Sequence, residues 1–223
     1  GVDWPKPTRV VVVRDLRGLS DMTGLPYESA ATTGTVGIAK WGRVTLLSPR
    51  ASQHGFAWRD TLAHELTHLA VTHASGDRAP LWLQEGLAKR EEIRWRGAAP
   101  FDDRPSPESV VAYGMQKHLD LPLDKLGPSI AMLPSADQAM VAFAEVTSFV
   151  RYLGAQAGDP AIEKLLAALR AGGKIDAAMT ASTGSDLHGW DEKWRAYLAT
   201  LGATPPAALA FADTKEARTM REK

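Results

Sequence analysis

The chain has 223 residues, of which 44% are hydrophobic and 23% charged, a composition typical of a globular protein long enough to bury a substantial core. Because 26 basic residues balance 26 acidic ones, no overall field favours nucleic acid or an anionic membrane surface, and no apolar run approaches the length of a membrane span. The absence of cysteine excludes disulfide bonds and thiolate metal ligands.

The N-terminal quarter of the chain carries strand signals. Residues 10–13 are a β-branched run between two arginines, which predicts a buried strand. Residues 15–34 are rich in Gly, Ser, Thr and Pro and predict a loop with at most one helical turn. Residues 35–39 and 43–47 then flank Lys40-Trp41-Gly42, a pattern typical of a hairpin in which glycine supplies the turn.

A helix expected from about Trp58 carries the sequence His64-Glu65-Leu66-Thr67-His68. Residues four apart return to nearly the same helical face, so the two imidazoles project side by side and can bind a single Zn²⁺, with the motif's glutamate as the usual general base. An apolar stripe lies roughly opposite and predicts a core-facing side (Leu62, Leu66 and Leu69). A helix with two incidental histidines is the alternative for this motif by itself.

The next segment, from Pro80 to about Arg96, predicts a second helix with a proline in its first turn. Its start is apolar nearly all round, and Glu85 is the only ionisable residue before Lys89. Because an isolated buried carboxylate is costly unless it is paired or bound to metal, Glu85 is a candidate ligand. Gly86 beside it would allow another helix to approach closely. Two histidines and one carboxylate, with a fourth position left for water, form the ligand set of a catalytic zinc site.

The rest of the sequence predicts a mainly helical region. Residues 97–107 hold three prolines and indicate an exposed loop, either a lid over the cleft or a plain connector. Helices are expected within 136–156, 162–169 and 190–198, where apolar residues recur at helical spacing. We expect a single domain over residues 1–201, in which 1–76 form a sheet and motif-helix lobe and 77–201 a helical lobe. Residues 202–223 indicate a tail or linker.

The motif helix together with Pro80-Leu81-Trp82-Leu83-Gln84-Glu85-Gly86-Leu87-Ala88 resembles the gluzincin metallopeptidases, in particular their small peptidase MA-like domains, over about residues 35–200. The resemblance implies that His64, His68 and Glu85 bind one Zn²⁺ and that Glu65 is the general base. It further implies a zincin-like α+β fold, with a small N-terminal β-sheet packed on the motif helix, a mainly helical C-terminal lobe, and the active-site cleft between them.

The same resemblance implies zinc-dependent hydrolysis of a peptide or protein substrate. A strand along the cleft would pair with the extended substrate backbone. No segment clearly supplies acidic residues for a free N-terminal amine, which favours an endopeptidase over an aminopeptidase. An exported or cell-envelope bacterial protein is the setting that the resemblance suggests.

Two positions depart from the family pattern. Phe143 stands where these domains often carry a tyrosine that donates to the transition state, and Lys89 stands where an acidic residue often orients a ligating histidine. Tyr113 and Tyr152 are the candidate replacement donors. Tyr113 ranks first because it follows the expected loop, whereas Tyr152 is nine positions after Phe143 and so falls on the opposite helical face.

These departures leave an alternative from another class, a zinc-containing peptide-binding or scaffold domain with weak or no turnover. Retention of Glu65 argues against it, because a structural zinc site has no need of a carboxylate beside the water. The other four histidines have spacings or positions that favour no metal role (His54, His73, His118 and His188).

Overall fold

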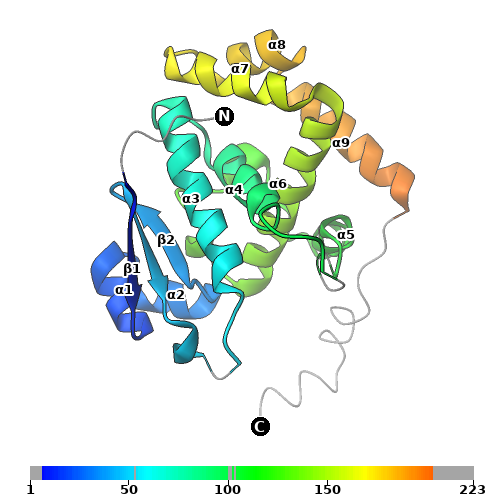
Figure 1. Ribbon diagram of the computed structural model, residues 1–223. Coiled ribbons are helices and arrows are strands. Elements are labelled where there is room, and N and C mark those ends of the chain that lie inside the picture. The colour runs from blue at the N-terminus through cyan, green and yellow to red at the C-terminus, as the bar shows by residue number, and fades with distance from the viewer. Residues whose placement is uncertain (1–6, 53, 100–101, 103, 203–223) are drawn as a thin grey trace.

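The computed structural model describes residues 7–52, 54–99, 102 and 104–202 (Figure 1). Within these residues the fold is α+β, as the sequence predicts, with one three-stranded sheet and nine α-helices. No helix in this part of the chain combines the length and the apolar character that crossing a membrane requires. The expected tail lies outside the described residues apart from Gly202.

The sheet contains β1 (Arg9–Val13), β2 (Gly37–Lys40) and β3 (Arg43–Leu47) in the order β1-β3-β2. β1 runs parallel to β3, and β2 runs antiparallel to it. The predicted hairpin is confirmed: Trp41 and Gly42 form its turn with φ of 55° and 71°, the left-handed pair that a two-residue hairpin turn requires.

The prediction that β1 is buried is wrong. β1 is an edge strand, and its Val10 and Val12 side chains are 42% and 60% exposed. The reason lies in the packing of the helices, because α3 packs on β2 and β3 and leaves this face of β1 uncovered. A run of valines specifies a strand but does not specify its place in the sheet.

The prediction of a loop over residues 15–34 is also wrong, because two short helices occupy most of it: α1 (Leu16–Thr23) and α2 (Tyr27–Thr33). The Asp15 side chain accepts a hydrogen bond from the Gly18 amide, which caps the start of α1. Gly24 and Gly34 end the two helices in the left-handed conformation. The glycines and the aspartate therefore delimit helices whose interiors bury Leu19 and Ala30 completely.

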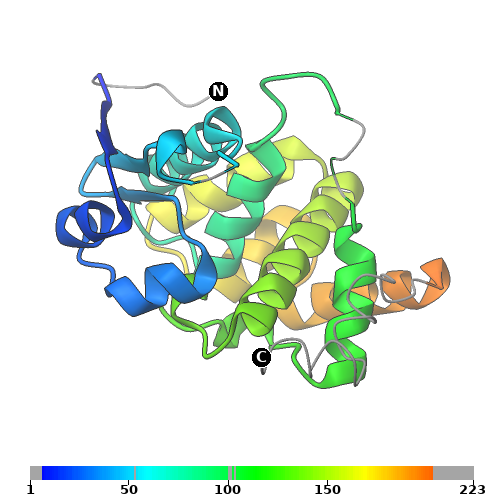
Figure 2. The same ribbon diagram turned by 90° about the horizontal axis from the view of Figure 1, so that it is seen from below.

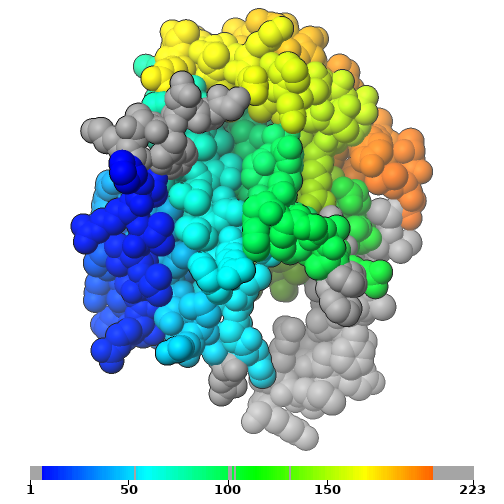
Figure 3. Space-filling view, in the orientation of Figure 1, coloured from blue at the N-terminus to red at the C-terminus, as the bar shows by residue number. Residues whose placement is uncertain are grey.

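The motif helix α3 (Trp58–Ser75) and the following α4 (Leu81–Glu91) lie side by side at the centre of the molecule (Figures 1 and 3). The expected apolar stripe of α3 does not enter the core: its three leucines are half-buried, and Leu69 lines the cleft described below. The sheet, α4 and α7 contact α3 from different sides, so most of its circumference is partly covered.

Helix α4 ends at Glu91, five residues before the predicted end. Residues 92–96 form turns instead, and their side chains are tied to the first turn of α3. Asp60 accepts hydrogen bonds from Trp95 Nε1 at 3.1 Å and from Arg96 Nη2 at 2.8 Å. This link to α3 competes with continuation of the helix.

The C-terminal half of the described chain contains α5 (Pro107–Lys117), α6 (Ala136–Ala157), α7 (Asp159–Arg170), α8 (Ile175–Thr183) and α9 (Leu187–Leu201). The predicted helices over 136–156, 162–169 and 190–198 are confirmed. Figures 1 and 2 show α6 beside α4 and α5, with which it packs. Residues 100, 101 and 103 of the expected 97–107 loop lie outside the described part.

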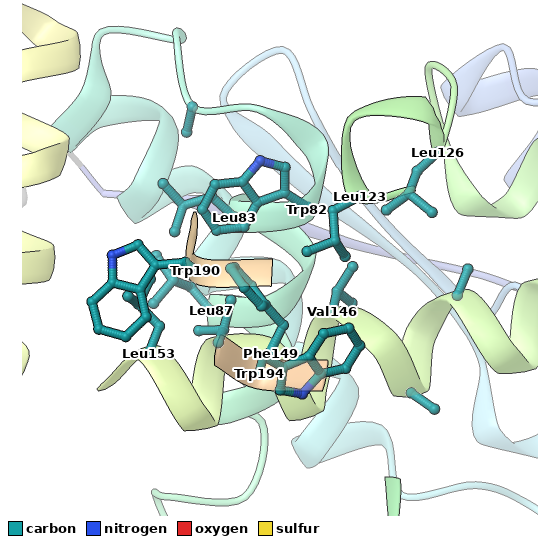
Figure 4. Close-up of a cluster of buried hydrophobic side chains, with 14 of the residues drawn as sticks. Trp82, Leu83, Leu87, Leu123, Leu126, Val146, Phe149, Leu153, Trp190 and Trp194 are labelled. Carbon is teal, nitrogen blue, oxygen red and sulfur yellow. The ribbon is translucent and has the colours of Figure 1, made fainter. Parts of the chain in front are cut away.

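The hydrophobic core lies where α4, α6 and α9 meet. The rings of Trp82 and Phe149 are edge to face with centroids 5.3 Å apart, and Phe149 meets Trp194 in the same way at 5.7 Å (Figure 4). Gly86 lets α4 approach α6 closely, as the sequence predicts: a Cβ there would lie 2.3 Å from Val150 Cγ2. The residue next to Glu85 is thus fixed against α6.

Candidate metal centre

Helices α3 and α4 bring His64, His68 and Glu85 into one cluster. The Nε2 atoms of His64 and His68 are 3.1 Å apart, and Glu85 Oε2 lies 3.5 Å from the first and 3.6 Å from the second. Among the residues that the structure describes, these three form the one group of His, Asp and Glu side chains close enough to share a metal ion. The three predicted ligands therefore converge although sixteen residues separate the last two in the sequence.

The separations fit a tetrahedral ion. Ligand atoms at metal distances of about 2.0–2.1 Å around a tetrahedral centre are about 3.3 Å from one another. The observed 3.1 to 3.6 Å lies around this value, and the donors are two imidazole nitrogens and one carboxylate oxygen. The residues present therefore fit a metal ion that binds nitrogen and oxygen ligands.

His64, His68 and Glu85 affect one another's pKa values. Burial opposes the charged form of His64, but hydrogen bonds to Glu85 and Glu92 outweigh it and raise the pKa of His64 to about 9. For His68, burial and the charge of His64 lower the pKa. Burial alone would raise the pKa of Glu85, yet its hydrogen bond to His64 and the charges around it hold that pKa below the usual range. A metal ion would compete with the protons here, because these ligands bind metals in their deprotonated forms.

Glu92 joins the cluster and was not predicted. Its Oε2 atom lies 3.2 Å from Nδ1 of His64, the nitrogen that faces away from the other ligands, and 2.8 Å from Nζ of Lys89. Burial would raise the pKa of Glu92, but the hydrogen bond to His64 and the charge of Lys89 outweigh it and lower the pKa to about 2. A carboxylate therefore orients His64 even though position 89 holds a lysine. Its spacing of seven residues, two helical turns after Glu85, is the signal that could have found it.

Glu65 lies beside the cluster on α3 and is only 6% exposed. Burial and the negative charge of Glu85 raise its pKa to about 7, while the charge of His64 and a hydrogen bond from the Ala39 amide oppose the rise. Strand β2 can lie this close because residue 37 is glycine: a Cβ there would be 2.8 Å from Thr61 Cγ2 and 3.1 Å from Glu65 Cγ. The edge strand and the motif helix thus hold Glu65 between them.

A cleft of about 600 Å³ opens over the cluster. Its lining includes strand β2, the side chains of His64, Glu65, His68 and Glu85 from α3 and α4, and Met132 and Phe143. A second cavity, of about 410 Å³, lies on the other side of Phe143 and is lined by Lys89 and Glu92 among others. Strand β2 therefore borders the cleft in which the cluster lies.

The two candidate donor tyrosines are placed elsewhere. Tyr113 on α5 is 5% exposed and belongs to the hydrophobic core. Tyr152 on α6 stacks on Tyr197 at 4.9 Å and meets Trp190 edge to face at 6.2 Å. Neither lines the cleft, whereas Phe143 does. The structure does not bring either tyrosine to the cluster, and their catalytic role stays a prediction.

The remaining histidines lie outside the cluster. His54 and His118 are exposed, His188 is exposed and lies 3.4 Å from Glu192, and His73 is half-buried near the end of α3. None belongs to the metal-binding group found among the described residues.

A family model described as the Peptidase MA superfamily matches residues 51–200, a range that contains α3 to α8 and all but the last residue of α9. No curated protein and no solved structure matches the chain.

Proposed function

Since the chain belongs to the peptidase MA superfamily, we propose that it hydrolyses peptide bonds with one zinc ion held by His64, His68 and Glu85. The observation that carries the proposal is the convergence of these three side chains beside Glu65 at the floor of an open cleft. Two imidazoles and one carboxylate leave a position for water, as catalytic zinc sites do and closed structural sites do not. When bound, zinc supplies Lewis acidity, which polarises a carbonyl group and lowers the pKa of water.

Glu65 acts as the general base. Its carboxylate, buried beside the cluster, is placed to take a proton from the attacking water and pass it to the leaving amine. The Ala39 amide, which donates to this carboxylate, holds it in place from β2. Glu65 is one residue from His64, so the base and a ligand are fixed by the same turn of helix.

Strand β2 binds the substrate backbone. Leu47 N donates to Val36 O at 2.7 Å, and hydrogen-bonded pairs recur at every second residue of an antiparallel ladder. Ile38 and Lys40 therefore direct their backbone groups to β3, whereas Gly37 and Ala39 direct theirs to the opposite edge, where the Ala39 amide donates to Glu65. An extended peptide can add to this edge as a further strand and lie along the cleft, which suits an endopeptidase.

A zinc-containing peptide-binding domain with weak turnover is the second candidate, and the cleft wall supplies the observation that favours it. Phe143 cannot donate a hydrogen bond, and no tyrosine is among the described residues that line the cleft. Loss of one transition-state donor costs about 2.7–4 kcal/mol, a factor of roughly 10²–10³ in rate. Binding and positioning could thus persist with little hydrolysis.

Metal analysis and turnover of a broad peptide library test the proposal. The purified chain should contain close to one zinc, and Glu85→Ala should lose most of it. Glu65→Gln should keep both the zinc and the fold and lose hydrolysis by a factor of roughly 10² or more. Stoichiometric zinc in a His64→Ala/His68→Ala double variant would refute the site, and unchanged turnover in Glu65→Gln would refute the role of the base. Zinc binding without turnover of any peptide would favour the binding domain.

A further inference from the structure

The two positions at which this chain departs from the family pattern contact each other. Nζ of Lys89 on α4 lies 5.5 Å from the centroid of the Phe143 ring on α6, within the range of a cation–π interaction. The same Nζ lies 2.8 Å from Glu92 Oε2. Phe143 thus supports the lysine on one side while the carboxylate holds it on the other.

Glu92 connects Lys89 to His64, because the same carboxylate oxygen contacts both. Its Oε2 atom lies 3.2 Å from His64 Nδ1 and so meets two nitrogen donors, Lys89 Nζ and His64 Nδ1–H. A histidine that donates from Nδ1 presents the lone pair of Nε2, and in His64 this is the nitrogen that faces His68 and Glu85. The imidazole is therefore fixed in both orientation and tautomer.

The segment that carries Glu92 is itself tied to the helix of His64. Glu92 follows the last residue of α4, where a chain end would otherwise be free to fray. Arg96 donates three hydrogen bonds to Asp60 on α3, at 2.8 to 3.2 Å, and Trp95 Nε1 donates a fourth at 3.1 Å. These contacts hold the segment of Glu92 next to α3, so that its carboxylate stays close to His64.

We propose that Phe143, Lys89 and Glu92 form a positioning chain that holds the His64 imidazole with Nε2 toward the metal site. The proposal rests on the proposed function, since it assigns these residues a purpose within the same zinc centre. Lys89 and Glu92 line the second cavity and are not among the residues that line the cleft. Lys89 and Glu92 therefore act through His64 rather than on the substrate. Phe143 takes part through its contact with Lys89.

Zinc affinity, measured by competition with a chelating dye, tests the role of each residue of the positioning chain. Glu92→Gln keeps the size of the side chain, removes its charge, and should weaken zinc binding by about 10- to 100-fold. Lys89→Met should weaken it several-fold in the wild-type background. In the Glu92→Gln background, Lys89→Met should have no further effect, because the lysine acts only through the carboxylate. Phe143→Leu should change affinity in the same direction as Lys89→Met.

Arg94→Met is the matched control. Arg94 pairs with Glu91 at 2.9 Å at the same end of α4, is 57% exposed, and has no contact with His64 among those found, so its loss should leave zinc affinity unchanged. Thermal unfolding checks that each variant is folded. In proton NMR spectra of the zinc-loaded protein, the His64 Nδ1–H proton should exchange slowly with water in the wild type and in Arg94→Met. The same proton should exchange faster in Glu92→Gln.

The outcomes separate this inference from the proposed function. Equal zinc affinities in Glu92→Gln and the wild type, or fully additive effects of Glu92→Gln and Lys89→Met, would overturn the positioning chain and leave peptide hydrolysis untouched. If the variants differ in zinc affinity as expected but the zinc-loaded wild type hydrolyses no peptide, the proposed function is overturned and the positioning chain is still supported.

Discussion

Glu92 lies seven residues after Glu85, just past the end of α4, and the two glutamates meet different nitrogens of His64. Glu85 Oε2 lies near Nε2 of both histidines, whereas Glu92 Oε2 lies at Nδ1 of His64 alone. The nitrogen that each carboxylate meets decides its role. A carboxylate on the Nε2 side shares the space where a metal ion fits, and one on the Nδ1 side can only orient the ring.

Phe143→Tyr tests whether a missing donor limits turnover. The new hydroxyl would stand on the cleft wall, so at equal zinc loading we expect turnover to rise, by up to about 10²-fold if the hydroxyl reaches the developing oxyanion. Tyr152→Phe should change turnover little, because that side chain packs against Trp190 and Tyr197. A hundredfold loss in Tyr113→Phe would show that α5 moves on substrate binding and that the donor comes from there.

The contact between α4 and α6 helps to set the position of Glu85 in the candidate metal centre. Gly86 follows Glu85 directly, and the backbone of α6 runs so close that a Cβ at residue 86 would lie 2.6 Å from Val146 O. Backbone atoms cannot give way as a flexible side chain can. The close approach therefore fixes how far Glu85 reaches toward α3.

Gly86→Ala should destabilise the protein despite the better helix propensity of alanine, which is worth about 1 kcal/mol. Separating α4 from α6 costs typically about 1–3 kcal/mol or more, and we expect a net loss of that order in the free energy of unfolding. Urea denaturation measures this loss, and zinc affinity should fall with it as Glu85 shifts. Gly97→Ala is the control, because a Cβ there meets no atom within 4 Å. Equal stability of Gly86→Ala and the wild type would contradict the argument.

Local patterns predicted the elements that carry the cluster, because an i,i+4 histidine pair and a lone carboxylate in an apolar helix are signals within a few residues. The same reasoning failed where tertiary contacts decide. α1 and α2 form in a segment of poor helix formers because caps and the burial of Leu19 and Ala30 stabilise them. Glu92 was missed because its role depends on where α4 ends, and that end is set by the contacts of Asp60 with Trp95 and Arg96.

The cleft is lined by parts of the chain that lie far apart in the sequence: strand β2, the helices α3 and α4, and Phe143 of α6. The sheet brings β2 beside Glu65, and α6 contributes Phe143 to the lining of the cleft. Helix α6 also packs against α4, α5 and α9, so the wall of the cleft belongs to the element that organises the core. Changes in the packing of α6 should therefore affect global stability and the site together.

Glu145 lies in the middle of α6, completely buried, and gives the whole fold a dependence on pH. Its Oε2 accepts a hydrogen bond from the Leu121 amide at 3.3 Å, and Oε1 has no partner among the described residues. Burial raises the pKa of Glu145 to about 8, well above the ordinary value of 4.5. Between these values the folded protein keeps a proton that the unfolded chain releases. The resulting stabilisation is full below pH 4.5 and is lost as pH rises through 8.

Glu145→Gln removes the ionisable group and keeps the shape of the side chain, so its free energy of unfolding should fall less than that of the wild type as pH rises. Between pH 5 and 8 the difference should amount to about 3–4 kcal/mol, since each unit of pKa difference is worth about 1.4 kcal/mol and the carboxyl group titrates gradually around pH 4.5 in the unfolded chain and around pH 8 in the fold. Urea denaturation at a series of pH values, with a chelator present so that metal binding does not contribute, measures it. Glu192→Gln makes the same charge change at an exposed position on α9, 68% accessible, and should follow the wild-type curve. Parallel curves for Glu145→Gln and the wild type would mean that Glu145 is already ionised in the folded protein, so that the burial of α6 against its neighbours does not hold the proton.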